Sequence, residues 1–310
     1  MIGRALSNIL LGKGYEVIVL TRDAGSHKPP VAGANGRLSY AAWDVPNQAI
    51  DMAAVEKADY IVHLAGAGVA DKRWSAKRKK EIADSRTNSC GLIIKALKEN
   101  PNKVKAVISA SGIGWYGPDP SIPNPKPFVE TDKPHTDFLG ETCRLWEGAI
   151  KPVTALGKRL VILRTGMALS NAGGALAEFK KPLQLGVAAV LGSGSQVVSW
   201  VHIDDLCRMF LKAIEDHAME GVYNAVSPKP VSNKTLTLAL AKAMRGKFYL
   251  PLHVPSFLLK LVLGEMSIEV LKSATVNANK IRTAGFDFLY PSIEAAINAL
   301  TNHPTPLKGE

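Results

Sequence analysis

The stretch that decides the fold is DYIVHLAGAG, residues 59–68. Its first half is a short apolar run, typical of a strand buried in a parallel sheet. Its second half, Leu64 to Gly68, leaves the strand through leucine, alanine and glycine only. Such small residues allow either a flat ligand to approach the backbone or the following helix to pack tightly. The pattern predicts a buried strand that ends at a candidate ligand site.

Similar apolar runs recur and alternate with helical patterns. We expect further strands at residues 16–20, 105–109, 159–164 and 222–226, and helices at 3–11, 75–87, 89–99, 138–156, 204–216 and 233–244. This alternation predicts an α/β fold, a doubly wound parallel sheet with helices on both faces. Six prolines between residues 118 and 134 predict a loop over the carboxyl edge of the sheet, where such folds bind ligands. We expect a main domain over residues 1–165 and a smaller α/β lobe over 166–310, with a helical part from about 250.

Composition excludes several classes of protein. The chain has 310 residues, of which 46% are hydrophobic, so it is not a disordered protein. It has no apolar run of about 18 residues, and polar residues interrupt the N-terminus, so we expect neither a membrane partner nor a signal peptide. The three cysteines lie far apart, which excludes a disulfide framework and favours a cytoplasmic location. No P-loop, metal-ligand spacing or nucleophile elbow is present.

The charge balance favours anionic partners. Lysine and arginine number 38 and aspartate and glutamate 27, giving a net charge of +11. The densest basic run, residues 72–80, is open to three interpretations: a solvated helix face, a face near a cofactor phosphate, or a nucleic-acid patch. The low aromatic content of 6% and the lack of a recognition motif argue against nucleic acid.

A set of short motifs occurs in order along nearly the whole chain. It includes Val19-Leu20-Thr21-Arg22, His63-Leu64-Ala65-Gly66, Leu163-Arg164-Thr165-Gly166, Trp200-Val201-His202-Ile203-Asp204-Asp205 and Ala284-Gly285-Phe286. Together they resemble the extended short-chain dehydrogenase/reductase superfamily, and within it an epimerase-like subfamily that carries a C-terminal domain of unknown function. The resemblance implies a Rossmann-type dinucleotide-binding core over residues 1–165 and a substrate-side lobe after it.

The resemblance also implies a cofactor site, for which NADP(H) is favoured. An acidic residue at the tip of the second strand would hold a ribose 2′-hydroxyl, whereas Arg22 accommodates a 2′-phosphate; the alternative is an ordinary surface arginine. The other positions that the resemblance assigns to the cofactor are Gly3, Thr21, Leu64, Ala65, Gly66, Glu81, Arg86 and Arg164. Glu81 and Arg86 are five residues apart and do not share one helical stripe, so each is alternatively a surface ion-pair member.

Two departures from the family pattern stand out. The chain opens at Met1-Ile2-Gly3, already inside the first helix, so we expect the first strand and its glycine-rich turn to be missing through truncation or a misassigned start. That strand would lie mid-sheet, and its two neighbours would stay unpaired. Secondly, the catalytic Tyr and the Lys four residues later are absent, because Leu139 and Cys143 occupy their positions.

Substitutes for the lost catalytic pair come from other strand ends. We consider Ser109 and Ser111 as hydroxyls that bond a substrate, Tyr116 as an acid, and His202 as a ligand-facing histidine. Each has a structural alternative: loop packing for Tyr116, and a histidine bonded to backbone for His202. The leading hypothesis is an NADP(H)-binding, epimerase-like oxidoreductase with an unknown small-molecule substrate. Its rivals are a catalytically inactive nucleotide-binding or sensor protein and, on charge alone, a nucleic-acid-associated protein.

Overall fold

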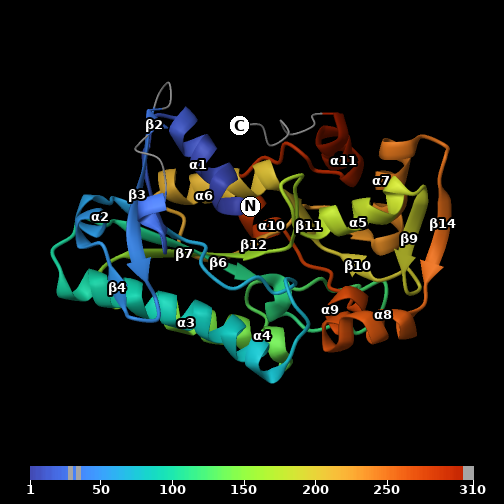
Figure 1. The fold of residues 1–310 in the computed structure, drawn as a ribbon, viewed down its shortest axis with the longest axis horizontal. Coiled ribbons are helices and arrows are strands. Elements are labelled where there is room, and N and C mark those ends of the chain that lie inside the picture. The colour runs from blue at the N-terminus through green and yellow to red at the C-terminus, as the bar shows by residue number, and fades with distance from the viewer. Residues whose placement is uncertain (27–30, 33–35, 303–310) are drawn as a thin grey trace.

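The centre of the protein is a parallel sheet with helices on both faces (Figure 1). The structure is a computed structural model that describes residues 1–26, 31–32 and 36–302. One group of strands runs in the order β12–β7–β6–β5, and every neighbouring pair is parallel. These strands are β5 (Tyr60–His63), β6 (Ala106–Gly112), β7 (Arg159–Thr165) and β12 (Gly221–Ala225). The predicted α/β fold is confirmed, and all four strands lie within three residues of their predicted positions.

A second group of strands contains β1 (Glu16–Thr21), which pairs in parallel with β3 (Arg37–Asp44). Two short strands, β2 (Val31–Ala32) and β4 (Ala49–Ile50), pair with β3 in antiparallel fashion. Within the described part of the chain, β1 and β5 each pair on one side only. The sequence did not predict β3, because its apolar residues are interspersed with Ser39, alanines and the terminal Asp44.

Four helices cover the sheet. In Figure 1, α1 (Ile2–Gly12) and α6 (Ile203–Glu215) lie on one face, and α3 (Ala76–Glu99) and α4 (Phe138–Ile150) lie on the other. The predicted break in the 75–99 region is wrong: α3 is continuous, because its buried face continues from Ile82 through Ser89 to Leu97. The predicted helix over 138–156 is α-helical only to Ile150, where α4 ends; it continues as a 3₁₀ helix with Pro152 at its start, because proline does not fit the interior of an α-helix. A short helix, α2 (Met52–Lys57), precedes β5.

The smaller lobe has a core of its own around Trp200, which packs with Leu169, Leu236 and Ile297. Its helices are α5 (Ala175–Gln184), α7 (Asn233–Arg245), α8 (Ser256–Leu263), α9 (Ser267–Leu271) and α11 (Ile293–Asn302). Its strands are β8 (Met167–Leu169), β9 (Val187–Leu191), β10 (Val197–Val198), β11 (Trp200–His202), β13 (Val231–Ser232) and β14 (Leu250–Val254).

The two cores do not follow the predicted division at residue 165. α6 and β12 pack in the main core although they lie beyond that residue, and so does α10 (Asn279–Thr283). The chain therefore crosses between the two cores several times. None of the described helices combines the length and the apolarity needed to span a bilayer.

Candidate functional site

The first turn of α1 lies against the end of β5. A Cβ atom on Gly3 would be 3.7 Å from Leu64 Cδ1, so these two predicted cofactor residues are close neighbours. The chain turns at Gly14 and returns as β1, which packs on α1 and ends at Thr21. Arg22 follows directly and is exposed to solvent. The start of α1, the tip of β1 and the end of β5 therefore gather at the carboxyl edge of the sheet.

The start of α1 is suited to an anion. No side chain caps this eleven-residue helix, and its first turn contains no acidic residue. The first N–H groups of a helix have no partner inside the helix and carry partial positive charge. A phosphate group placed there would accept these hydrogen bonds, and Gly3 has no side chain to block its approach.

Two arginines of α3 hold the loop that follows β5. Arg86 Nη1 donates a 3.0 Å hydrogen bond to the Ala67 carbonyl, and Arg78 Nη2 donates a 2.6 Å bond to the Gly68 carbonyl. Ser85 Oγ accepts a 2.9 Å bond from the Ala67 amide. A Cβ on Gly66 would lie 3.0 Å from Arg86 Cζ, so only glycine fits there without displacing the guanidinium. The loop is thus held by its backbone and is not buried, since Gly66 is exposed and its neighbours in residues 64–68 are partly exposed.

Arg86 and Glu81, both predicted to line the cofactor, have other surroundings. Arg86 is buried, and its guanidinium lies 4.8 Å from the centre of the Trp146 ring. It contacts the loop through its hydrogen bond to the Ala67 carbonyl. Glu81 is exposed and pairs with Arg78 Nη1 at 2.8 Å, an interaction that lowers the pKa of its carboxyl. On α3, Arg78 lies between the other two residues: Glu81 is about 60° from it around the helix axis and Arg86 about 80° on the other side, so Glu81 and Arg86 are about 140° apart. We therefore assign Arg86 a positioning role and Glu81 an ion-pair role.

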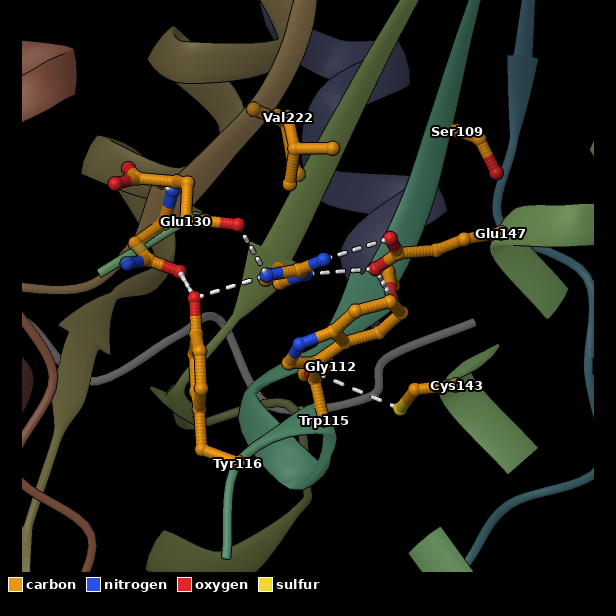
Figure 2. A network of polar contacts seen from close by, with 12 residues as sticks. Ser109, Gly112, Trp115, Tyr116, Glu130, Cys143, Glu147 and Val222 are labelled. Carbon is orange, nitrogen blue, oxygen red and sulfur yellow. Dashed lines mark hydrogen bonds and ion pairs between the residues drawn. The ribbon is translucent and has the colours of Figure 1, made fainter. Parts of the chain in front are cut away.

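A buried ion pair lies beside the end of β6 (Figure 2). Arg164 of β7 donates to both oxygens of Glu147 of α4, through Nε at 2.8 Å and Nη2 at 2.9 Å. Its guanidinium also lies 3.6 Å from the centre of the Trp115 ring and donates to the Glu130 carbonyl. Arg164 is only 2% exposed, so every polar atom of this group is used inside the protein. The predicted cofactor role of Arg164 is not supported by this geometry.

Tyr116 belongs to the same network. Its hydroxyl accepts a 3.0 Å bond from Arg164 Nη1 and donates a 2.7 Å bond to Asn224 Oδ1 (Figure 2). Its ring stacks on Phe128 of the proline-rich loop, and the residue has no exposed surface. Burial raises the pKa of Tyr116 to about 12, although Arg164 opposes this shift. The geometry therefore supports the alternative of loop packing for Tyr116 over a role as an acid.

The two predicted serines also face inward. Ser111 Oγ donates a 2.7 Å bond to Glu147 Oε1, and Ser109 Oγ lies 3.3 Å from His63 Nδ1. Both residues are buried. Alternation along β6 places these two hydroxyls on the same side of the strand, where the partner of Ser111 lies on α4 and that of Ser109 on β5. Neither hydroxyl is open to a substrate in this arrangement.

His202 ends β11 and caps α6. Its Nδ1 accepts a 3.1 Å bond from the Asp204 amide, and its ring lies 3.8 Å from that of Tyr290. Burial lowers the pKa of His202, partly offset by Asp204 and Asp205. Its Nε2 atom is buried and has no hydrogen-bond partner among the described residues. The structure supports the alternative of a histidine bonded to backbone, since His202 caps the start of α6.

The positions of the family's Tyr and Lys carry no acid or base. Leu139 packs against Gly114, where an added Cβ would lie 2.9 Å from Leu139 Cβ. Cys143 donates through Sγ to the Gly112 carbonyl at 3.5 Å (Figure 2). Burial, followed by the charge of Glu147, raises the pKa of Cys143 to about 11, so its thiol stays protonated at neutral pH. Cys143 is consequently a poor nucleophile.

Sequence reasoning missed the polar cluster around His63 at the end of β5. His63 Nε2 lies 2.8 Å from Ser89 Oγ, and Trp146 Nε1 approaches Nδ1 at 3.4 Å. Burial, with a smaller contribution from Arg86, lowers the pKa of His63 to about 4. It also missed Arg78 and Glu147. The signal for Arg78 was its eight-residue spacing from Arg86, while nothing local to Glu147 identified Arg164 as its partner.

A dinucleotide fits the residues that remain open. The uncapped start of α1 suits a pyrophosphate, the exposed Arg22 suits a 2′-phosphate, and the backbone from Leu64 to Gly68 is partly exposed. Together these groups line one edge of the sheet, the edge at which open α/β sheets bind ligands.

Comparisons with known proteins agree with this fold. A family model described as the NAD dependent epimerase/dehydratase family matches residues 1–225, and a domain of unknown function, DUF1731, matches residues 254–300. The epimerase family protein SSP1921 of Staphylococcus saprophyticus is 32% identical over 97% of this chain and 96% of its own length.

Solved structures give the same result. The human epimerase family protein SDR39U1, crystallised with NADPH, is 27% identical, with a TM-score of 0.82 over 97% of this chain and 96% of its own. A nucleoside-diphosphate sugar epimerase from Corynebacterium glutamicum is 30% identical, with a TM-score of 0.73 over 97% of this chain and 56% of its own. The resemblance drawn from the motifs is confirmed: the chain belongs to the NAD dependent epimerase/dehydratase family and carries its DUF1731 domain at the C-terminal end.

Proposed function

We propose that this protein binds NADP(H) at the carboxyl edge of the sheet and is an epimerase-like oxidoreductase that acts on a small molecule. The observation that carries the proposal is the grouping of the α1 start, the exposed Arg22 and the glycine-rich loop after β5. The NADPH bound to the human relative supports the choice of cofactor.

Each part of the edge has a role in this proposal. The first turn of α1 would hold the pyrophosphate, and Arg22 would hold the 2′-phosphate through charge-assisted hydrogen bonds. The backbone from Leu64 to Gly68 would lie against the cofactor, held in place by Arg78 and Arg86 from behind. When bound, the nicotinamide supplies hydride transfer, and the protein supplies position and exclusion of water.

A second candidate function is nucleotide binding without catalysis. The observations that favour it are Leu139 and Cys143 at the positions of the catalytic pair, and the burial of Ser109, Ser111 and Tyr116. In this alternative the protein binds NADP(H) with the same groups but does not turn it over.

Two measurements separate these functions. The first is a fluorescence titration with NADPH and NADH, in which we expect tighter binding of NADPH; a protein that binds neither would refute both functions. The second is loss of NADPH absorbance with a panel of aldehydes, ketones and sugar nucleotides. Oxidation of bound NADPH by one class of carbonyl supports the oxidoreductase, and binding without oxidation supports the inactive binder.

A further inference from the structure

The end of the smaller lobe exposes an unusual amount of apolar surface. Between Arg245 and Leu263 the large side chains open to solvent are Phe248, Leu250, Leu252, Phe257, Leu261 and Val262. Phe248 is 88% exposed, Phe257 70% and Leu261 73%. We call these six residues the apolar tip. They belong to β14, the turn before it and α8, and Figure 1 shows both elements at the same end of the molecule.

Basic residues surround the apolar tip. Lys242, Arg245, Lys247 and Lys260 are all exposed, and the chain has no aspartate or glutamate between Glu220 and Glu265. Glu265 itself is paired with Lys79 at 2.8 Å. On the neighbouring α5, Glu178 is paired with Lys181. The surface around the apolar tip is therefore positively charged, and it complements an anionic partner.

β14 is poorly suited to pair with a strand of another chain. It pairs in parallel with β9. The Leu250 amide donates to the Gly186 carbonyl, and the Gly192 amide donates to the Val254 carbonyl. Backbone groups alternate in direction along a strand, so those of Pro251 and His253 face the free edge. Pro251 has no N–H to donate, a common device that keeps an edge strand from extending its sheet.

Charge also argues against a second copy of this chain as the occupant. A twofold dimer would place the same basic rim on both sides of the interface, where like charges repel. A lipid surface has no such cost and needs no backbone pairing. Exposed aromatic and aliphatic side chains flanked by lysine and arginine are typical of segments that bind at the interface of an anionic bilayer.

We propose that the apolar tip binds reversibly to the surface of an anionic lipid bilayer. Phe248, Phe257 and Leu261 enter the boundary between headgroups and acyl chains, and Lys247 and Lys260 contact the anionic headgroups. The lack of a spanning segment led us to expect no membrane partner, but that reasoning does not address binding at the surface. The proposal is independent of the cofactor site, since its residues lie on the surface of the smaller lobe.

The test is co-sedimentation of the full chain with two kinds of vesicle, phosphatidylcholine alone and phosphatidylcholine mixed with phosphatidylserine. We expect binding to the mixed vesicles only, and less of it at high salt. The variant Lys247→Glu/Lys260→Glu should weaken binding about tenfold or more. The variant Phe257→Ser/Leu261→Ser should abolish it, whereas the control Ile122→Ser/Leu289→Ser, which changes exposed apolar residues elsewhere, should bind like the unmodified protein.

Several outcomes would overturn the proposal. Equal binding to both kinds of vesicle would remove the electrostatic argument, and no binding to either would exclude the bilayer. Analytical ultracentrifugation tests the other occupant. If the unmodified protein is a dimer and the Phe257→Ser/Leu261→Ser variant is a monomer, the apolar tip binds a second copy of this chain. Matching thermal unfolding midpoints of all variants would show that loss of binding does not reflect loss of fold.

Discussion

Removal of Glu147 tests the buried network most sharply. Glu147 accepts both guanidinium bonds of Arg164, and its only other hydrogen bond in the network comes from Ser111. In the variant Glu147→Ala the charge of Arg164 stays in the core with neutral acceptors alone, the Tyr116 hydroxyl and the Glu130 carbonyl. The network joins β6, α4, β7 and β12, so its loss affects the centre of the sheet.

The expected magnitude follows from the burial of the pair. Arg164 and Glu147 have side chains only 2% and 10% exposed. Removal of one partner of such a pair costs about 3–5 kcal/mol, because the other charge remains buried without compensation. Typical stabilities are about 5–15 kcal/mol, so a large part of the stability is lost. With a slope of about 3 kcal/mol per molar urea, the unfolding midpoint falls by about 1 M or more.

The assay is urea unfolding followed by tryptophan fluorescence, with two further variants. Glu141→Ala removes a carboxylate from the same helix, but its pair with Arg144 is exposed, so we expect almost no change in the midpoint. The double variant Glu147→Ala/Arg164→Met removes both charges and should lose much less stability than the two single losses added together. Two results would contradict the assignment of a buried ion pair. One is a Glu147→Ala midpoint equal to that of Glu141→Ala, and the other is additive losses of stability in the double variant.

Three other predictions follow from the same core. His63 has a pKa of about 4 in the folded protein and about 6.5 when unfolded, so the unfolded chain takes up the proton first as the pH falls. Stability should decrease by about 3 kcal/mol between pH 6.5 and pH 4 in urea unfolding, and His63→Gln should flatten that decrease; an unchanged slope would contradict the assignment. Burial raises the pKa of each thiol, to about 12, 11 and 12 for Cys90, Cys143 and Cys207, so none should react with a disulfide reagent at pH 8 until the protein is unfolded. Rapid labelling of any one of the three thiols in the native protein would contradict this prediction. Finally, Arg86→Met removes the hydrogen bond to the Ala67 carbonyl and should weaken NADPH binding about tenfold in a fluorescence titration. The control Glu81→Ala should not weaken it. Equal effects of the two variants would mean that Arg86 does not position the loop.

The fold was predictable where burial leaves a simple pattern. β6 and β7 are continuous runs of buried residues, because helices lie on both faces of the sheet. β1 and β5 have similar apolar runs, although most of their residues are only partly buried. β3 was missed because its run of apolar residues is interrupted, and it lies at the side of the sheet. The division between cores was also misjudged, because residues 203–225 return to the main sheet after the chain has entered the smaller lobe.

The candidate site was predictable in position but not in detail. Strand ends in a parallel sheet share one edge, so the sequence predicts Gly3, Arg22 and Leu64 at that edge, and the structure brings Gly3 and Leu64 together. The direction of a side chain depends on its hydrogen-bond partners, and the sequence does not show which distant residues these are. Ser111 turns inward because Glu147 lies on a helix 36 residues away, and Tyr116 because Asn224 lies 108 residues away.

The central claim is that the carboxyl edge of the sheet binds a dinucleotide and that Arg22 recognises its 2′-phosphate. The most direct measurement is the ratio of the NADH and NADPH dissociation constants for the unmodified protein and for Arg22→Ala. We expect NADPH to bind at least about tenfold more tightly than NADH, as a charge-assisted bond to phosphate would give. Arg22→Ala should lose this preference while its affinity for NADH is unchanged. A preference for NADPH that persists in Arg22→Ala, or equal binding of both cofactors to the unmodified protein, would contradict it.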